Sequence, residues 1–215
     1  MRSNSMAGDW QRLLAPGLKT LGVTLPAGGE AALLRYVGLL ERWNQAYNLT
    51  AIRDPGEMLT KHVLDSLAVL PFVTSDPVAD VGTGAGLPGI PLAIARPELR
   101  FTLLDSNGKK TRFVTQAMAE LKLANVEVVQ SRSEAYHPAT PFALVLSRAF
   151  ASLSDFATLA GGMAVPGGRL LAMKGARPEE EIAALPAGFR LVAVHPLKVP
   201  GLGAERCLVE LEKQA

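Results

Sequence analysis

The chain has 215 residues, the usual length of one domain with a small accessory element. Apolar residues make up 48% and charged residues 20%, so the composition predicts a globular protein with a substantial core and excludes a disordered chain. The net charge of +2 permits a nucleic-acid partner without arguing for one.

The sequence also argues against a membrane protein and against a disulfide-stabilised protein. No apolar run approaches the ~20 residues that span a bilayer, and the N-terminal segment lacks the apolar stretch of a signal peptide. Cys207 is the only cysteine, so the chain cannot form an internal disulfide, and we expect no cysteine-based metal site. We therefore expect a cytoplasmic protein with no membrane contact and no bound metal, and we expect a monomer.

The first third of the chain has the pattern of helices. Apolar residues recur at helical spacing over residues 31–43. Asp54 followed by Pro55 is typical of an N-cap and a first helical turn, and predicts a second helix. We predict a helical extension over residues 1–72 that packs on a second unit, residues 73–215.

The rest of the chain alternates short apolar runs with helical segments. This order predicts βαβ units and a parallel sheet covered on both faces. The last two runs have no helix between them and predict an antiparallel hairpin at the sheet edge. We expect an α/β, Rossmann-like fold whose seven-stranded, mostly parallel sheet ends in this hairpin, which resembles the sheet of class I methyltransferases more than a standard dinucleotide-binding fold. The predicted strands are 78–81, 101–105, 126–130, 142–147, 169–174, 189–196 and 206–212, and the predicted helices among them are 88–95, 109–121, 153–161 and 178–185.

A glycine-rich loop follows the first predicted strand. Glycines at this place let the backbone turn and approach a ligand, and helix amides then point at the crevice above the strand ends. A dinucleotide-binding loop needs its third glycine at position 87, where this chain has Leu87. The observed spacing instead resembles the loop that binds S-adenosylmethionine, although an ordinary glycine-rich turn is the alternative. The loop is Asp80-Val81-Gly82-Thr83-Gly84-Ala85-Gly86-Leu87-Pro88-Gly89.

Two carboxylates support S-adenosylmethionine as the cofactor. Asp80 can attract the ammonium or sulfonium end of this molecule, whereas it would repel a pyrophosphate. Asp105 ends the second strand. In folds of this kind an acidic residue ~20 residues past the loop accepts hydrogen bonds from ribose hydroxyls, and Asp105 lies only slightly farther along the chain. A cap of the next helix is the alternative for Asp105. The predicted cofactor contacts from this part of the chain are Asp80, Gly82, Thr83, Gly84, Gly86, Leu87 and Asp105.

Other strand ends also carry polar side chains. Ser133 and Glu134 follow the third strand, where they either bracket an adenine or cap a helix. Arg148 follows the fourth strand, and its guanidinium suits a phosphate or the O6 and N7 atoms of guanine, or else an ordinary carboxylate partner. Lys174 ends the fifth strand, as an RNA contact or as a snorkelling side chain. Lys110 lies near the start of a helix, where it either binds an anion or belongs to a solvated face.

Several longer motifs, in order along the chain, closely resemble the ribosomal RNA small subunit methyltransferase G family, also called GidB. The resemblance runs from about residue 30 to Glu212, and Ala85 stands where many members have proline. The motifs are Tyr47-Asn48-Leu49-Thr50, His62-x-x-Asp65-Ser66, Asp80-Val81-Gly82-Thr83-Gly84-x-Gly86-Leu87-Pro88-Gly89-Ile90-Pro91, Leu104-Asp105-Ser106-x-Gly108-Lys109-Lys110, Ser147-Arg148-Ala149-Phe150-Ala151-Ser152-Leu153, Lys174-Gly175 and Gly203-x-Glu205-Arg206.

This resemblance implies transfer of a methyl group from S-adenosylmethionine to N7 of a guanine, at the 527-type position in the 530 loop of bacterial 16S rRNA, with the free RNA or a 30S assembly intermediate as partner. Guanine N7 has a lone pair and no proton, so the reaction needs orientation rather than a general base. We assign Arg148 and Lys174 to the catalytic site. The resemblance implies cofactor contacts at Gly82, Leu87, Ser133, Glu134 and Arg148.

Three other functions stay open at this point. A nicotinamide oxidoreductase shares the fold class, but the misplaced third glycine counts against it. A non-catalytic RNA-binding protein would use the N-terminal helices as its interface, and the weak net charge and the intact carboxylates count against it. A methyltransferase for another RNA, a small molecule or a protein is opposed only by the family resemblance.

Overall fold

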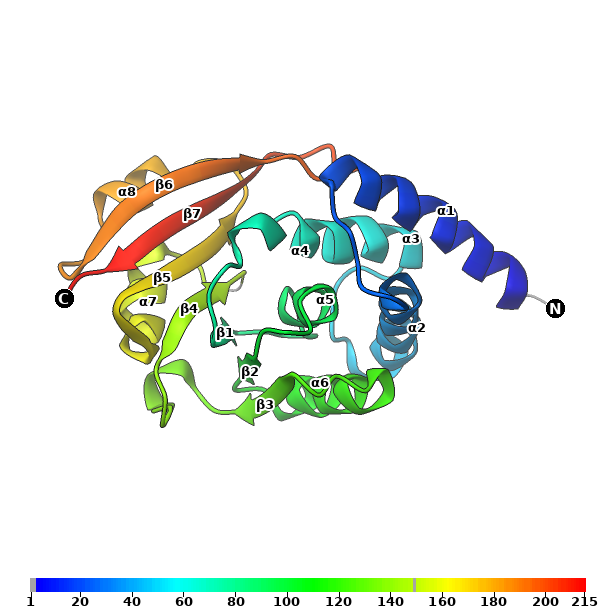
Figure 1. The fold of residues 1–215 in the computed structure, drawn as a ribbon, viewed down its shortest axis with the longest axis horizontal. Coiled ribbons are helices and arrows are strands. Elements are labelled where there is room, and N and C mark those ends of the chain that lie inside the picture. The colour runs from blue at the N-terminus through cyan, green and yellow to red at the C-terminus, as the bar shows by residue number, and fades with distance from the viewer. Residues whose placement is uncertain (1–2, 149) are drawn as a thin grey trace.

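The structure is a computed structural model that describes residues 3–148 and 150–215 (Figure 1). A seven-stranded sheet in the order β3-β2-β1-β4-β5-β7-β6 forms its centre. Strands β1 to β5 pair in parallel, and β7 pairs antiparallel with both β5 and β6. The predicted α/β fold and its final hairpin are thus confirmed. The strands are β1 (Val78–Val81), β2 (Phe101–Asp105), β3 (Val126–Gln130), β4 (Phe142–Ser147), β5 (Ala164–Lys174), β6 (Phe189–Leu197) and β7 (Arg206–Lys213).

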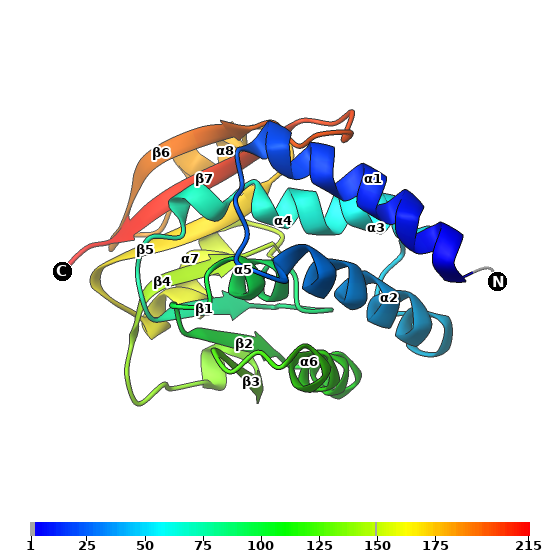
Figure 2. The same cartoon turned by 45° about the vertical axis from the view of Figure 1, so that its right-hand side comes forward.

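Helices cover both faces of the sheet (Figures 1 and 2). Alternate residues of each strand face opposite cores, because successive side chains of a strand point to opposite sides. Val78 and Leu103 therefore join the core under α1 to α6, whereas Ala79 and Leu104 join the core under α7. The helices are α1 (Ser3–Leu21), α2 (Gly29–Tyr47), α3 (Pro55–Met58), α4 (Asp65–Leu67), α5 (Gly89–Ala95), α6 (Gly108–Leu121), α7 (Leu153–Ala160) and α8 (Glu179–Ala183), with the short helices η1 (Leu59–Leu64), η2 (Leu70–Phe72), η3 (Ser133–Ala135) and η4 (Gly161–Met163).

The N-terminal helices share one hydrophobic core with the sheet unit. Helix α2 contacts both α5 and α6, and α4 contacts α5. Leu33 and Val37 of α2 are fully buried, and the ring of Trp43 lies 5.7 Å from that of Phe113 in α6. Of the extension predicted over residues 1–72, residues 1 and 2 lie outside the described part, and the boundary at residue 72 stays a prediction.

Two elements differ from their predicted form. Strand β5 begins at Ala164 rather than at residue 169. The sequence Pro166-Gly167-Gly168 suggests a turn, but in the structure it lies within the strand, where the pairing register with β4 shifts. The helix opened by Asp54, whose side chain accepts the Glu57 N–H at 2.8 Å, is not a single α-helix. It passes through the π-helix η1 before α4. Such π segments are common at functional sites.

Candidate active site

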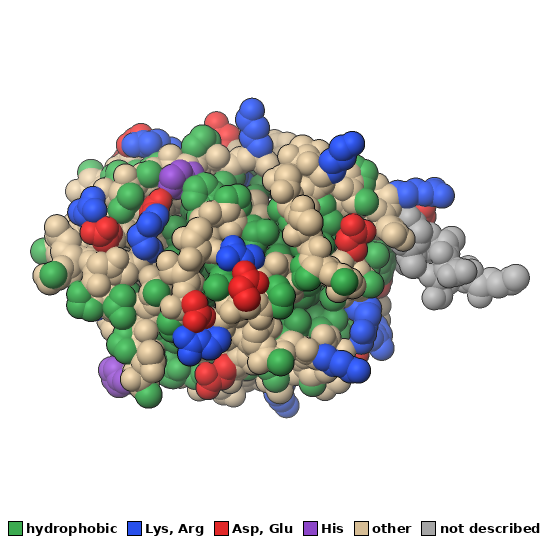
Figure 3. Space-filling view, viewed as in Figure 1, with side chains coloured by type: hydrophobic (Ala, Val, Ile, Leu, Met, Phe, Trp, Pro, Cys, Tyr) green, Lys and Arg blue, Asp and Glu red, His purple; other side chains and the backbone are tan. Residues whose placement is uncertain are grey.

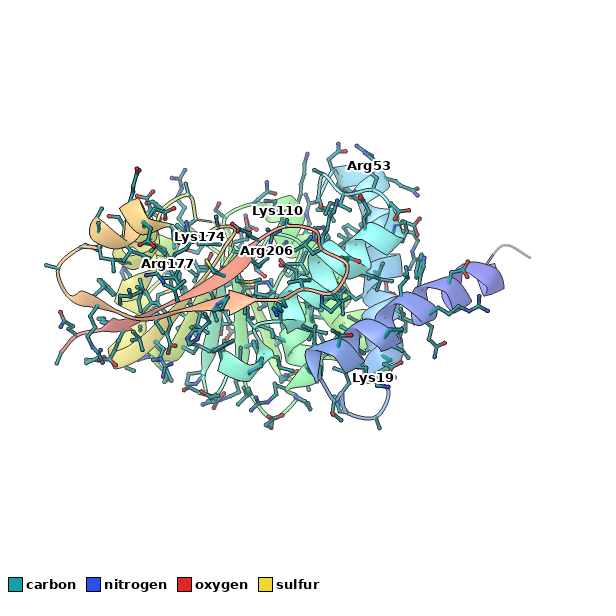
Figure 4. All side chains as sticks on the ribbon, turned by 90° about the horizontal axis from the view of Figure 1, so that it is seen from above. Lys19, Arg53, Lys110, Lys174, Arg177 and Arg206 are labelled. Atoms are coloured by element: carbon teal, nitrogen blue, oxygen red, sulfur yellow. The ribbon has the colours of Figure 1, made fainter. Side chains whose placement is uncertain are left out.

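The predicted site residues meet at the carboxyl edge of the parallel strands. Three neighbouring hollows of about 440, 230 and 380 Å³ lie there. Gly82 and Lys110 line both the 440 and the 230 Å³ hollows, and Arg148 lines both the 230 and the 380 Å³ hollows. Figure 4 shows Lys110, Lys174 and Arg206 gathered at this edge, although they come from a helix and two different strands.

The glycine loop has a backbone that ordinary residues rarely adopt. Gly82, Gly84 and Gly86 have φ angles of 71°, 61° and 87°, in the left-handed region that favours glycine. A Cβ atom on Gly86 would lie 2.5 Å from Ile90 Cδ1, and one on Gly89 would collide with Leu103 and approach Asp80. The loop therefore needs glycine for its shape and for close packing against α5, in addition to any ligand contact.

Asp80 is fully buried beneath this loop. Its Oδ2 accepts the Thr83 hydroxyl at 2.7 Å and the Gly89 N–H at 2.8 Å. Burial raises the pKa of Asp80 to about 6, although these two hydrogen bonds act in the opposite direction. Its Oδ1 is buried and has no hydrogen-bond partner among the described residues. An orphaned carboxylate oxygen in the loop fits a cationic ligand group placed above it.

Asp105 joins the loop to the second strand. Its Oδ2 accepts the Gly84 N–H and its Oδ1 accepts the Asn107 N–H, each at 2.8 Å. Asn107, rather than Asp105, caps α6 through Lys109 N–H and Lys110 N–H. The capping alternative for Asp105 is therefore wrong. Its carboxylate lines the 440 Å³ hollow, and each oxygen keeps a second lone pair for another donor.

The 440 Å³ hollow brings together Gly82, Asp105, Ser133 and Glu134, which the sequence placed in one site. Ser133 and Glu134 belong to the short helix η3 and cap no α-helix. The size of the 440 Å³ hollow falls within the range of small-molecule sites, and its wall combines a carboxylate with hydroxyl groups. The other lining residues are Val81, Leu104, Ser106, Lys110, Ser131, Arg132 and Phe150.

The 230 Å³ hollow is lined by the same loop. Thr83, Gly84 and Leu87 of the loop line it together with Arg148 and His62. Lys110 also lines this hollow, so the two hollows are adjacent. Two of the predicted cofactor residues, Asp80 and Gly86, line none of the three hollows.

Tyr36 is a site residue that the sequence did not identify. Its hydroxyl, on α2, donates to the Ala85 carbonyl in the glycine loop at 2.7 Å. Burial raises the pKa of Tyr36, so the hydroxyl keeps its proton as a donor. A buried tyrosine must find a hydrogen-bond partner, but the sequence does not show which one. The N-terminal extension thus fixes the loop directly.

Arg148 lines the 380 Å³ hollow, and both of its hydrogen-bond partners come from the N-terminal third of the chain. Its Nη1 donates to the Lys61 carbonyl at 3.3 Å and to Asp65 Oδ2 at 3.4 Å. Arg206 Nε donates to Asp65 Oδ1 at 3.0 Å. Asp65, which the sequence did not single out as a site residue, therefore holds two arginines. Ala149, the neighbour of Arg148 in the predicted motif, lies outside the described residues.

Lys174 supports the segment after β4. Its Nζ lies 2.8 Å from Glu181 Oε2 and donates to the carbonyls of Phe150 and Ala151 at 3.3 and 3.1 Å. These contacts use all three of its N–H donors and leave its side chain 12% exposed. The geometry favours a positioning role, and contact with a substrate stays a prediction.

His62 forms part of the wall between the two smaller hollows. Its Nδ1 lies 3.2 Å from the Lys61 carbonyl, which can only accept, so Nδ1 carries the proton. Its Nε2 then accepts the Thr50 hydroxyl at 2.8 Å. Burial, together with the nearby Arg148, lowers the pKa of His62 to about 4. His62 is therefore neutral near pH 7 and fixes the Thr50 loop.

Other chemistries find little support among the described residues. No group of three or more His, Cys, Asp or Glu side chains is placed to hold a metal ion. Cys207 is buried in β7, and burial raises the pKa of its thiol, which does not suit a nucleophile. Within residues 3–148 and 150–215, no helix is long and apolar enough to cross a membrane.

Solved structures share this fold. A glycopeptide N-methyltransferase, MtfA, in complex with S-adenosylhomocysteine matches with a TM-score of 0.60 over 72% of this chain and 87% of its own, at 14% identity. At that identity the likeness shows the fold alone, and it confirms the class I methyltransferase sheet.

Closer relatives share nearly the whole sequence. The ribosomal RNA small subunit methyltransferase G of Alkalilimnicola ehrlichii is 55% identical over 205 residues, which are 95% of this chain and 93% of the relative. The protein of the same name from Xanthomonas euvesicatoria pv. vesicatoria is 51% identical over 213 residues, 99% of this chain and 100% of the relative. With the model of the GidB family, rRNA small subunit methyltransferase G, also matching residues 30–209, the chain belongs to that family.

Proposed function

We propose that this chain transfers a methyl group from S-adenosylmethionine to N7 of a guanine at the 527-type position, in the 530 loop, of bacterial 16S rRNA. Membership of the family makes the chain an S-adenosylmethionine-dependent rRNA methyltransferase. One observation carries the proposal at the level of the site. A nucleoside-sized hollow with a carboxylate wall adjoins, through the glycine loop, a second hollow walled by Arg148.

The residues present fit this cofactor. Asp105 offers acceptor capacity for ribose hydroxyls, and Ser133 and Glu134 line the same 440 Å³ hollow, where they are available to the adenine. The orphaned Asp80 Oδ1 supplies negative charge beneath the loop for the cationic end. The other proposed contacts of the loop are Gly82, Thr83, Gly84, Gly86 and Leu87.

Bound S-adenosylmethionine supplies an electrophilic methyl group on a sulfonium. Guanine N7 presents its lone pair without losing a proton, so the chain has to orient the base and exclude water. His62 does not suit the role of a general base, because its pKa is about 4 and its Nε2 already accepts the Thr50 hydroxyl. A proton-free acceptor such as N7 suits this arrangement.

Arg148 and Lys174 take different roles in the proposal. Arg148 lines both smaller hollows, so its guanidinium can bind the substrate next to the methyl donor, as well as the cofactor. Lys174 holds the carbonyls of Phe150 and Ala151 and thereby positions the segment that follows Arg148. We propose Lys174 as a positioning residue for the transfer.

The finer identity of the partner belongs to the same proposal. We infer that the chain acts as a monomer in the cytoplasm, on 16S rRNA either free or in a 30S assembly intermediate. A nicotinamide oxidoreductase and a non-catalytic RNA-binding protein do not agree with the family. Methylation of another RNA is the alternative that the experiment must separate.

Mass mapping of 16S rRNA tests the proposal. The protein is incubated with S-adenosylmethionine and, in parallel, with 16S rRNA or with 30S particles from cells lacking the modification, and nuclease fragments are weighed. We expect one added methyl group in one fragment of the 530 loop, identified as N7-methylguanosine. Methylation at another atom or in another RNA would contradict the proposed substrate, and the comparison of RNA with particles identifies the partner.

A further inference from the structure

The 380 Å³ hollow has an unusual balance of charge. The Asp65 side chain is only 2% exposed and lies against Arg148 and Arg206, whose side chains are 28% and 29% exposed. One buried carboxylate thus faces two guanidinium groups. The other cations of this hollow already have acidic partners, since Lys61 pairs with Glu57 and Lys174 with Glu181. His62 is neutral at the pH of the cell.

Asp80 also attracts Arg148, but its carboxylate does not lie in the 380 Å³ hollow and does not neutralise the arginines there. Its carboxylate lies beneath the glycine loop, bonded to Thr83 and Gly89, and it lines none of the three hollows. In the proposed function its charge faces the cationic cofactor. A positive charge therefore remains on the arginine pair for an anion that enters the 380 Å³ hollow.

The arginine pair also has unused donors. Arg148 uses Nη1 for the Lys61 carbonyl and Asp65, and Arg206 uses Nε for Asp65 and Nη1 for the Glu205 carbonyl. Within the described residues, Nη2 of each arginine has no partner. Two guanidinium groups with unused N–H donors match the oxygens of a phosphodiester better than the single edge of a base.

The place of the pair fits a substrate that continues beyond its target base. Arg148 lines both the 380 Å³ hollow and the 230 Å³ hollow beside the glycine loop. Figure 4 shows Arg206 at the same edge as Lys174 and Lys110, with Arg177 nearby. Over the face shown in Figure 3, acidic and basic side chains are interspersed.

We propose that Arg148 and Arg206, held by the buried carboxylate of Asp65, form a subsite for one phosphodiester group of the RNA next to the target nucleotide. The proposal rests on the proposed function for the identity of the RNA. Asp65 is the positioning residue of the subsite. Its carboxylate sets the separation of the two arginines, which lie far apart in the sequence.

A neutral replacement of single phosphates in the RNA tests this directly with the wild-type chain. A fragment of 16S rRNA that contains the target guanine is made with one methylphosphonate linkage at a time, and binding is measured by fluorescence anisotropy. We expect about tenfold weaker binding for one linkage adjacent to the target and little effect elsewhere. Equal binding of all the fragments would overturn the proposal.

Variants identify the protein side of this contact. Arg206→Gln should weaken binding of the unmodified fragment about tenfold, reduce the dependence of log K on log salt by about one, and abolish the effect of the sensitive linkage. Arg206→Lys should restore part of the salt dependence. Asp65→Asn should raise KM for RNA more than it lowers kcat. Arg190→Gln, which removes another arginine paired with a carboxylate in the same hairpin, is the matched control.

The possible outcomes distinguish failure of the subsite proposal from failure of the proposed function. The Arg206→Gln variant could unfold more easily and yet bind every fragment like the wild type. That result would show that the arginine pair only stabilises the fold, and it would overturn the proposal. Loss of S-adenosylmethionine binding instead of RNA binding would assign the pair to the cofactor's carboxylate and overturn it as well. Linkage-dependent binding without methyl transfer would support the subsite and contradict the proposed function.

Discussion

The glycine loop and the arginine pair are both organised by a buried aspartate, but in opposite ways. Asp80 holds the loop by neutral donors and keeps one oxygen without a partner among the described residues. Asp65 receives a guanidinium on each oxygen. The first arrangement leaves negative charge for a cationic ligand, and the second leaves positive charge for an anion. In our proposals the first arrangement is the cofactor half of the site and the second is its RNA half.

The largest expected effect comes from Arg148, which belongs to both halves. Arg148→Ala should lower kcat/KM for RNA methylation about 100-fold, because a substrate that loses its orientation reacts far more slowly. Binding of S-adenosylmethionine should weaken much less, since the carboxylates of the loop remain. Arg190→Ala serves as the control for loss of a surface charge. Methylation rates equal to those of the wild type would show that the halves do not meet at Arg148.

Gly89→Ala should weaken S-adenosylmethionine binding about tenfold, because the added methyl group overpacks the space between Leu103 and Asp80. Calorimetry measures the affinity. Gly162→Ala is the matched control, since a Cβ there meets nothing within 4 Å and its φ is not in the left-handed region. Unchanged affinity in Gly89→Ala would mean that close packing at α5 does not shape the cofactor half.

The pKa of Asp80 near 6 predicts a smaller, pH-dependent effect. Ionised Asp80 attracts the cationic end of the cofactor, so affinity should rise about threefold as the pH rises through 6. Without cofactor, the folded chain binds this proton more tightly than the unfolded chain does. The free energy of unfolding contributed by Asp80 therefore falls as the pH rises from about 4 to 6.

Asp80→Asn should lose the contribution of Asp80 to both pH dependences, as measured by calorimetry and by urea unfolding from pH 4.5 to 7.5. His62 contributes the opposite trend, because its lowered pKa makes the folded chain lose stability as the pH falls from about 6.5 to 4. The difference between Asp80→Asn and the wild type isolates Asp80. An affinity that varies with pH equally in both proteins would contradict the charge assigned to Asp80.

Tyr36→Phe should have the smallest effect. Losing the hydrogen bond to the Ala85 carbonyl, with that carbonyl left buried, costs about 1 kcal/mol of stability. Urea unfolding measures this cost, and cofactor affinity should fall only about twofold. Tyr47→Phe is the control, because the Tyr47 side chain is exposed. A tenfold loss of affinity would give α2 a larger part in the cofactor half.

The two halves also differ in how far the sequence could predict them. Most of the cofactor half lies in one loop and at the end of the next strand, so the glycine spacing and the position of Asp105 were enough to predict these residues, whereas Tyr36 was missed. Their roles as cofactor contacts stay predictions. The sequence did not show that Asp80 lies under the loop or that Asp105 bonds to Gly84, because these depend on side-chain geometry.

The RNA half could be predicted only in pieces. Arg148 was identified from its place at a strand end, but its partner Asp65 lies 83 positions before it along the chain and 141 positions before Arg206. Helical periodicity does not predict the π-helix η1 just before Asp65. Strand pairing of β7 between β5 and β6, which brings Arg206 to the same edge, is likewise a property of the topology.

A crystal structure with S-adenosylhomocysteine and a short RNA that carries the target guanine is the most direct test of the division into a cofactor half and an RNA half. We predict the adenosine in the 440 Å³ hollow beside Asp105. We predict the target guanine beside the glycine loop with N7 turned toward the cofactor sulfur, and an adjacent phosphate on Arg148 and Arg206. A cofactor bound away from the glycine loop, or a guanine that presents another atom to the sulfur, would contradict this division.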